Sequence, residues 1–396
     1  MKRIEIITFE RAFEIVMGSS LSTGTERIPF MESLNRVLGE KVMCDRDMPP
    51  FDKSSVDGFA CRRADVENDL EILETIQAGK IPERSIGKNQ CSRIMTGAIV
   101  PSGADCVIMV EDTFITPSGN VRFKGIFKKE NIAHKGEDAI KGTAVLNPGR
   151  IIKPQDIAVM ASVGHTLVNV NRRVEIGIIS SGDELVEPSE LPGPATIRNS
   201  NAYQLIAQAG QTGASAKYYG IAGDDEEETY SLINKAISEN DMVLVTGGVS
   251  MGDFDFVPSV LERAGVRILF SGVAVQPGKP TTFGIHNKAL VFGLPGNPVS
   301  SFIQFELLVK PMIYKTMGYD WKPKTVVLPI KEKFTRKFAE RMALIPVSVD
   351  GEGFVVPVEY HGSGHLSALS VADGIIVMQT GVNVIEKGEL VSVRQI

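Results

Sequence analysis

The strongest constraint on the fold comes from residues 174–313, where apolar runs of strand length alternate with segments of helical length. Strands are predicted at VEIGIIS, SAKYYGIA, MVLVTGG and ALVFGL, and helices at SNAYQLIAQAG, EEETYSLINKAISEN, FVPSVLERAG and PVSSFIQFELLVK. Strands that alternate with helices of about 10–15 residues are typical of a parallel sheet covered on both faces. We therefore predict a three-layer α/β unit in this part of the chain.

The flanking segments have a different character. Thr8 can cap an N-terminal helix that begins at Phe9, and a second helix is predicted from Pro29 to Leu38. Residues 51–140 carry short apolar runs between Gly, Pro, Asn and Asp clusters, which favours a small β-rich domain. A helix and a strand around 149–168 are expected to pair with the N-terminal segment, and the chain returns to β structure after about residue 321.

These patterns predict a chain of four domains, two of the α/β or extended kind and two rich in β structure. The predicted bounds are 1–43 with 141–172 for a discontinuous extended domain, 44–140 for a small β-rich domain, 173–320 for the α/β domain, and 321–396 for a C-terminal β-barrel-like domain.

Composition excludes several classes of partner. The net charge is −6, so no nucleic-acid partner is indicated, and no apolar run reaches the roughly 20 residues that span a membrane. Glu5 and Glu10 interrupt any signal-peptide core, and the four cysteines show no C-x-x-C spacing. We expect a soluble cytoplasmic protein with reduced thiols.

Glycine, hydroxyl and carboxylate residues follow several strands of the predicted sheet, and in open α/β sheets the ligand binds at that edge. The segments are Ser180–Glu184, Asp224 with Asp225, TGGVSMGDFDF (246–256), QPGKP with Lys279, and GLPGNP with Asn297 as a helix cap and Pro298 as its first residue. Each segment alone is more often an ordinary turn or helix cap. Together they indicate a site for a small phosphorylated ligand.

The coexistence of anion donors and acids leaves two interpretations open. In one, Mg²⁺ bridges the acids and a ligand phosphate. In the other, the acids accept hydrogen bonds from a heterocycle while the glycine loops hold its phosphate. The chain lacks G-x-x-x-x-G-K-[ST], G-x-G-x-x-G and G-x-S-x-G, and the spacing of His361 and His365 does not indicate zinc. Cys106 lies in an apolar run and is expected in a core.

Two further segments lie outside the α/β part. PPFDKSSVDGFA (49–60) and RIMTGA (93–98) combine glycine turns with acids and hydroxyl groups. They are either a hairpin and a domain junction, or functional loops that reach the central site from another domain or another subunit.

Several of these motifs occur in order along nearly the whole chain: PPFDKSSVDGFA, RIMTGAIVP, GED (136–138), SSGDELVEP, TGGVSMGDFDF, QPGKPTTFG and GLPGNPVSSF. In this respect the chain resembles the MoeA family of molybdopterin molybdenumtransferases, which is similar to the C-terminal E domain of gephyrin. The resemblance implies a homodimer of elongated subunits, with dimerisation through the discontinuous domain and a central domain like molybdopterin adenylyltransferase.

The implied reaction converts adenylylated molybdopterin and molybdate, with Mg²⁺, to molybdenum cofactor and AMP. Two other functions remain open, a molybdopterin adenylyltransferase and a gephyrin-like scaffold that binds partner proteins. An adenylyltransferase is also implied as a possible partner.

The resemblance also implies roles for individual residues. Asp57 and Thr96 match an acid and a hydroxyl presented by the second subunit, and Asp138 matches the GED acid. Catalytic and metal-binding acids of the central site match Glu184, Asp224 and Asp255. Phosphate, molybdate and pterin contacts match Gly247, Gly248, Ser250, Lys279, Pro295, Asn297, Pro298 and Ser300, with Arg341 and Ser367 from the last domain. Gln276 and Pro346 stand where many family members have basic residues.

Overall fold

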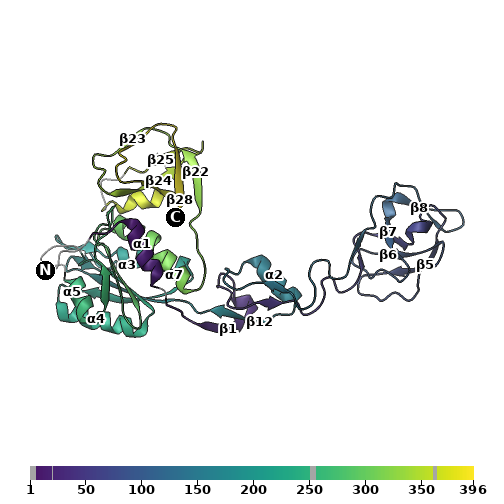
Figure 1. Ribbon diagram of the computed structural model, residues 1–396, viewed down its shortest axis with the longest axis horizontal. Helices are drawn as coiled ribbons and strands as arrows, with labels where there is room; N and C mark the ends of the chain where they lie inside the picture. The colour runs from purple at the N-terminus through teal and green to yellow at the C-terminus, as the bar shows by residue number, and fades with distance from the viewer. Residues whose placement is uncertain (1–5, 20, 250–255, 360–363) are drawn as a thin grey trace.

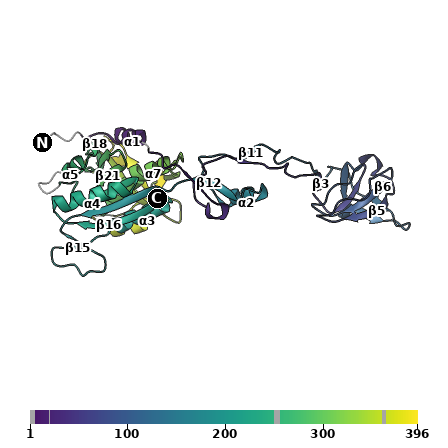
Figure 2. The ribbon, with the colours of Figure 1, turned by 90° about the horizontal axis from the view of Figure 1, so that it is seen from below.

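The computed structural model describes residues 6–19, 21–249, 256–359 and 364–396, and the molecule is elongated (Figure 1). The α/β unit and the C-terminal sheet lie together at one end. A narrow middle segment contains β12 (Leu167–Asn171) and α2 (Pro154–Ser162). The far end contains β5 (Glu71–Ile76) and β6 (Gln90–Ile94), and the same separation is visible in the perpendicular view (Figure 2).

The middle layer of the α/β unit is a six-stranded sheet in the order β16–β13–β17–β21–β20–β18. Its first four strands are parallel, as the alternation of strands and helices predicted. Their bounds are Ser215–Ala222 (β16), Glu175–Ser181 (β13), Met242–Thr246 (β17) and Leu290–Leu294 (β21).

One edge of the sheet differs from the parallel part that the sequence predicted. Strands β18 (Arg267–Phe270) and β20 (Thr282–Ile285) are antiparallel to their neighbours. The cause is a short turn between β20 and β21, closed by a 2.8 Å hydrogen bond from His286 N to the Ala289 carbonyl. Such a turn leaves no room for a crossover helix, so the two strands it joins can pair only in the antiparallel sense.

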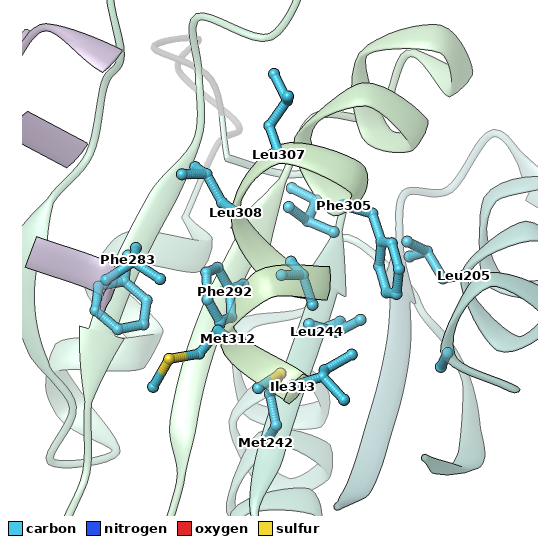
Figure 3. Packing of buried hydrophobic residues seen from close by; sticks show 14 of the residues in the cluster. Leu205, Met242, Leu244, Phe283, Phe292, Phe305, Leu307, Leu308, Met312 and Ile313 are labelled. Atoms are coloured by element: carbon cyan, nitrogen blue, oxygen red, sulfur yellow. The ribbon is translucent and has the colours of Figure 1, made fainter. Parts of the chain in front are cut away.

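Helices cover both faces of this sheet, as predicted. Ile178, Leu244 and Phe292 point into one buried cluster, whereas their neighbours Ile179, Val243 and Val291 point into the other. Figure 3 shows the first cluster, which the last helical stretch of the unit covers. The helical segments are α3 (Asn201–Gln211), α4 (Glu226–Glu239), α5 (Val257–Arg263), α6 (Pro298–Gln304), the π-helical η4 (Phe305–Val309) and α7 (Lys310–Thr316).

The N-terminal helix α1 (Phe9–Gly18) begins where the sequence predicted. The Thr8 hydroxyl accepts a 3.3 Å hydrogen bond from Arg11 N, which satisfies one of the free N–H groups of the first turn. Val16 is fully buried in the same cluster as the face of the sheet, and Lys315 of α7 donates a hydrogen bond to the Met17 carbonyl. Helix α1 is therefore held against the α/β unit.

The second predicted helix, from Pro29 to Leu38, does not form. Pro29 is the last residue of β1 (Thr25–Pro29), which pairs antiparallel with β12. Only a single 3-10 turn, η1 (Phe30–Glu32), follows. Asn35 then adopts a positive φ of 63°, a left-handed conformation that a continuing α-helix excludes.

The chain enters and leaves the far end through two segments that run side by side. Strand β2 (Val42–Met43) pairs with β11 (Ala144–Leu146), and Met48 forms a bridge with Ala139. Residues before and after the far end therefore meet again in the middle segment, as the discontinuous arrangement requires.

The far end, residues 53–133, is named the distal lobe and is rich in β structure, as predicted. Its main sheet has the order β5–β6–β4–β7, with β4 at Gly58–Cys61 and β7 at Cys106–Met109. Cys106 is fully buried in the core of this lobe, which confirms its predicted place. Smaller pairs join β3 (Lys53–Ser54) to β10 (Ile132–Ala133) and β8 (Thr113–Ile115) to β9 (Val121–Phe123).

The C-terminal part is a second sheet that takes one strand from the α/β unit. Strand β19 (Val275–Gln276) pairs with β24 (Met342–Val349). The sheet continues through β26 (Gly374–Met378), β28 (Leu390–Gln395) and β22 (Thr325–Pro329), with β25 (Val355–Pro357) beside β24. Two short strands, β23 (Phe334–Thr335) and β27 (Val384–Ile385), form a separate pair. Among the helices in the described part of the chain, none has both the length and the apolar character to cross a bilayer.

Candidate functional site

Three parallel strands of the central sheet end at the same level. Thr246 lies beside Ser180 on one side and beside Leu294 on the other. The loops that follow these residues therefore leave from one edge of the sheet, where open α/β sheets bind their ligands. These loops carry Glu184, Gly247 and Gly248, and the segment 295–298.

The loops surround a cavity of about 570 Å³, which we name the inner cavity. Five of the predicted site residues line it: Glu184, Gly247, Pro295, Asn297 and Pro298. Gly364 and Leu366 of the C-terminal part and Pro280 line it as well. The inner cavity therefore lies between the α/β unit and the C-terminal part, and its volume is typical of a site for a small organic ligand.

The glycines of the T-G-G turn are required by the packing beneath them. Gly247 has a φ of +93°, and a Cβ there would lie 2.2 Å from the Ser181 carbonyl oxygen. Gly248 also has a positive φ, and its Cβ would lie 2.7 Å from a methyl group of Val257. Only glycine allows the backbone this conformation and this close approach, so the turn brings the main chain of Gly247 and Val249 to the wall of the inner cavity. The N–H of Gly247 donates to the Leu294 carbonyl at 3.1 Å, which ties this turn to the end of β21.

The acids of the central unit fall into two groups. Glu184 is exposed and lines the inner cavity, and Asp224 is exposed in the loop after β16. Asp183 accepts a 2.8 Å hydrogen bond from Asp224 N, which holds these two loops together. Asp225 instead caps α4, because its carboxylate accepts a 2.8 Å hydrogen bond from Glu228 N. Its place is thus explained by helix capping.

Two predicted residues, Ser250 and Asp255, lie outside the described residues. Ser300 is 3% exposed in the first turn of α6, the helix that begins at Pro298 beside the inner cavity. It does not line the cavity, whereas Asn297 and Pro298 do.

The predicted basic residues both lie in segments next to the junction of the two sheets, where β19 pairs with β24. Lys279 is half-buried, and its carbonyl accepts hydrogen bonds of 2.9 Å from Val273 N and Thr281 N, which fix the turn. Arg341 directly precedes β24 and donates to the Val275 carbonyl at 3.3 Å, four residues before Lys279. Ser367 is exposed, next to Leu366 in the cavity wall.

The remaining predicted residues lie far from this cavity within the chain. Asp57 precedes β4 and Thr96 follows β6, both exposed on the distal lobe, and Asp138 lies between β10 and β11, where the chain returns from the lobe. Asp57 Oδ1 accepts hydrogen bonds of 2.7 Å from both the backbone N–H and the hydroxyl of Thr96. These two bonds lower the pKa of Asp57, since they stabilise the carboxylate. The structure pairs Asp57 with Thr96 but does not bring either to the inner cavity.

Sequence reasoning missed a polar wall formed by residues 198–201. Asn199 is 1% exposed, and its amide group accepts a 3.1 Å hydrogen bond from Ser180 Oγ and donates one of 2.7 Å to Tyr218. Asn201 donates to Thr246 Oγ1 at 2.9 Å and to the Gly296 carbonyl at 2.8 Å. The available signal was the pair of asparagines directly before and after Ser200. Amide side chains at the start of a helix often hydrogen-bond to nearby polar groups, so this pair could have indicated a polar wall.

The described acids near the inner cavity do not form a complete metal site by themselves. Among the described residues, no group of three or more His, Cys, Asp or Glu side chains could hold a metal ion by itself. Mg²⁺ does not need such a group, because it typically binds one or two carboxylates together with substrate phosphates and water. Glu184 at the inner cavity and Asp224 in the adjoining loop provide exposed carboxylates of this kind.

Fold and site together define a class of protein: a multidomain ligand-binding protein whose open α/β sheet and C-terminal sheet share a polar cavity. Models of three families match the chain in order. They are described as the MoeA N-terminal region (domain I and II) over residues 7–164, a probable molybdopterin binding domain over 177–315, and the MoeA C-terminal region (domain IV) over 329–396.

Individual relatives agree with these matches. A molybdopterin molybdenumtransferase of Staphylococcus epidermidis is 35% identical over 397 residues, with 98% of this chain and 95% of the relative covered. One of Bacillus subtilis is also 35% identical, with 93% and 89% covered. The crystal structure of a molybdopterin biosynthesis MoeA protein from Pyrococcus horikoshii superimposes with a TM-score of 0.85 at 28% identity, covering 99% of this chain and 100% of that one. The chain belongs to the MoeA family.

Proposed function

We propose that this chain is a molybdopterin molybdenumtransferase. It takes adenylylated molybdopterin and molybdate and yields molybdenum cofactor and AMP. The observation that supports this most strongly is the match of MoeA models along the chain, together with relatives of that name that align over nearly its whole length. The inner cavity of the same central unit supplies a site of suitable size.

In this proposal the inner cavity holds the phosphorylated part of the substrate. The turn at Gly247 and Gly248 brings the main chain that follows Gly247 to the phosphate, because the absent side chains allow the backbone a close approach. The N–H of Gly247 itself is not part of this contact, since it donates to the Leu294 carbonyl at 3.1 Å. Pro295, Asn297 and Pro298 form the opposite wall, with Ser300 and Ser250 as further contacts. Hydrogen bonds fixed before the substrate arrives stabilise the charge that develops on the leaving phosphate.

Mg²⁺ would be held by Glu184 and Asp224, with Asp255 as a further ligand. When bound, it offsets negative charge on the phosphate oxygens as the bond to AMP breaks. The exposed carboxylates of Glu184 and Asp224 can receive the ion without leaving a buried charge unpaired. Asp183 keeps the Asp224 loop in place through its hydrogen bond to the backbone.

Molybdate would bind where the two sheets meet, next to Lys279, Arg341 and Ser367. A doubly charged oxyanion needs positive charge and hydrogen-bond donors, and this junction supplies both. Gln276 is exposed directly before the Pro-Gly turn that leads to Lys279, so it offers an amide where many relatives offer a second positive charge.

The site is completed by a second copy of the chain. In a homodimer, the distal lobe of the partner subunit would bring Asp57 and Thr96 to the inner cavity. Asp138 would come from the segment that directly follows this lobe. The support is that Asp57 is exposed, ionised and held in one orientation by Thr96, although the lobe lies at the opposite end of the chain from the cavity (Figure 1). The middle segment would mediate dimerisation.

The four-part division of the chain, 1–43 with 141–172, 44–140, 173–320 and 321–396, belongs to the proposal. The side-by-side entry and exit of the distal lobe supports its first two parts. A cytoplasmic location belongs to it too, supported by four buried cysteines that are all free. An adenylyltransferase would supply the adenylylated substrate.

AMP release tests the proposal directly. Purified protein mixed with adenylylated molybdopterin, molybdate and Mg²⁺ should release AMP, and removal of Mg²⁺ with a chelator should stop the release. The same protein given ATP and molybdopterin should not adenylylate it. If AMP does not rise above the level without protein, the proposed reaction is wrong.

A further inference from the structure

A second cavity of about 590 Å³ adjoins the inner cavity. The two share Arg198, Asn199 and Ser200 as a common wall. The second cavity is further lined by Pro188, Ser189 and Tyr203, and we name it the outer shelf. None of the residues predicted from the sequence lines it, so the shelf is an unassigned extension of the site.

Tyr203 is an exposed aromatic ring that is nevertheless fixed in position. Its side chain lies in the first turn of α3 and the residue is 45% exposed. Its hydroxyl donates a 2.7 Å hydrogen bond to Glu187 Oε2, and its ring lies 5.8 Å from that of Tyr218 at an angle of 50°. The contact with Tyr218 and the hydrogen bond to Glu187 already restrict the rotamer of Tyr203. A ligand that stacks on its exposed ring would therefore cost little additional side-chain entropy.

Glu187 links the outer shelf to the inner cavity. Its second oxygen accepts a 2.8 Å hydrogen bond from Tyr218, and Tyr218 in turn accepts one from Asn199 in the shared wall. On the opposite side, Arg198 Nε donates to the carbonyls of Pro188 and Glu190 at 3.0 and 3.1 Å. The ring of Tyr203, the shared wall and the Pro188 turn therefore form one hydrogen-bonded unit.

We propose that the outer shelf binds a planar nitrogen heterocycle by stacking on Tyr203, while the phosphate joined to that heterocycle lies in the inner cavity. The heterocycle is a purine or a pteridine, because both present a flat aromatic face of the size that a tyrosine ring covers. The inference rests on the proposed function, in which the substrate carries a ring system at each end of its phosphate linkage.

Calorimetry with three separate probes tests the inference: AMP, ribose 5-phosphate and 6-hydroxymethylpterin. Tyr203→Ala should weaken binding of at least one heterocycle probe by about tenfold, the usual scale for loss of a base–aromatic stack. Ribose 5-phosphate has no heterocycle and should bind unchanged. Loss for AMP alone assigns the shelf to adenine, and loss for the pterin alone assigns it to the pterin.

Companion variants separate stacking from folding. Tyr203→Leu keeps apolar volume without an aromatic face and should match Tyr203→Ala, whereas Tyr203→Phe keeps the face and should lose only about twofold to threefold. Tyr230→Ala removes a tyrosine of α4 that packs on Arg263 outside the site, and it should change nothing. Unchanged binding of both heterocycles in Tyr203→Ala and Tyr203→Leu overturns the inference, as does wild-type protein that binds neither heterocycle.

AMP release by the unmodified protein separates this inference from the proposed function. If turnover is present but Tyr203 variants bind both probes normally, the shelf assignment alone is wrong. If heterocycle binding depends on Tyr203 but no AMP is released, the shelf stands and the proposed reaction fails.

Discussion

The inner cavity and the distal lobe present their acids in different ways. At and beside the cavity, Glu184 and Asp224 lie in loops that follow two adjacent parallel strands, β13 and β16. On the lobe, Asp57 precedes the short strand β4 and is fixed by two hydrogen bonds from Thr96. The cavity therefore combines space for a ligand with acids in exposed loops. The lobe offers one acid whose orientation is fixed by Thr96, but this acid lies far from the cavity of its own chain.

The difference shows how the two regions can be complementary. An acid that is held ionised and exposed is suited to a ligand that another surface supplies. A cavity formed by glycine turns and asparagines is suited to hold a ligand while a further group approaches. Variants in the two regions should therefore fail differently: the lobe in turnover and the cavity turn in stability.

The largest effect is expected at Asp57. Asp57→Asn keeps the size of the side chain but removes its charge, and we expect AMP release to fall by about a hundredfold or more, the scale of losing one well-placed catalytic group. The melting temperature should stay close to that of the parent, because an exposed side chain does not support a core. Steady-state AMP release and thermal unfolding measure the two quantities.

Glu111→Gln provides the matched control for Asp57→Asn. It neutralises another exposed acid of the distal lobe and should leave turnover unchanged. A large fall in melting temperature for Asp57→Asn, with turnover retained in the folded fraction, would make this acid structural and would remove the contrast between the regions.

The next effect is expected at the cavity turn. Gly247→Ala combines a positive φ of +93° with a Cβ 2.2 Å from a backbone oxygen, so we expect a loss of unfolding free energy of about 3 kcal/mol or more. Gly97→Ala, next to Thr96, has a φ of +81° but open space around its Cβ, and should cost about 1 kcal/mol. Denaturant unfolding measures the loss of unfolding free energy in each variant, and hydrogen exchange shows which region of the chain has been destabilised. Equal losses would show that packing beneath Gly247 is looser than described.

The smallest effect is a change in titration. Thr96→Val removes the hydroxyl donor but keeps the backbone N–H bond, so the pKa of Asp57 should rise toward its ordinary value of 3.8. The native pKa is lowered, so the stabilisation from Asp57 is present above the unfolded pKa and is lost as pH falls through the native value. Variant and parent should therefore differ in melting temperature near neutral pH and converge in acid. NMR titration of the Asp57 carboxyl measures the shift, and an unchanged pKa would show that the hydroxyl has no part in it.

Much of the fold could be predicted because local patterns were strong. The alternation of strands and helices after residue 174 was sufficient to predict the parallel part of the central sheet. The cap at Thr8 was sufficient to predict where α1 begins. The helix expected from Pro29 failed because partners far along the chain hold both of its ends: Pro29 pairs with Leu167 of β12, and Leu38 forms a bridge with Val170 of the same strand. The antiparallel edge was missed because β18 and β20 are short and are joined without a helix.

The site could be predicted only in part, because some of its residues are placed by local chain rules and others only by tertiary packing. Strand-end loops meet at one edge by the rules of parallel sheets, so Glu184, Gly247 and Asn297 were accessible to reasoning from sequence. Asn199 and Asn201 were not, because their roles depend on partners such as Tyr218 and Gly296 that tertiary packing brings near. Whether a partner's Asp57 reaches the inner cavity, as proposed, depends on quaternary structure, which local patterns do not encode.

The measurement that tests the central claim most directly mixes two inactive variants. Asp57→Asn lacks the lobe acid, and Lys279→Ala lacks the cation proposed to bind molybdate where the two sheets meet. Subunits of the two variants are exchanged in equal amounts before AMP release is measured. If each cavity uses the lobe of the partner subunit, half of the dimers are mixed and carry one intact site of two, so activity should recover to about one quarter of the parent value. No recovery in dimers shown by mass to be mixed would place the whole site in one chain and contradict the account.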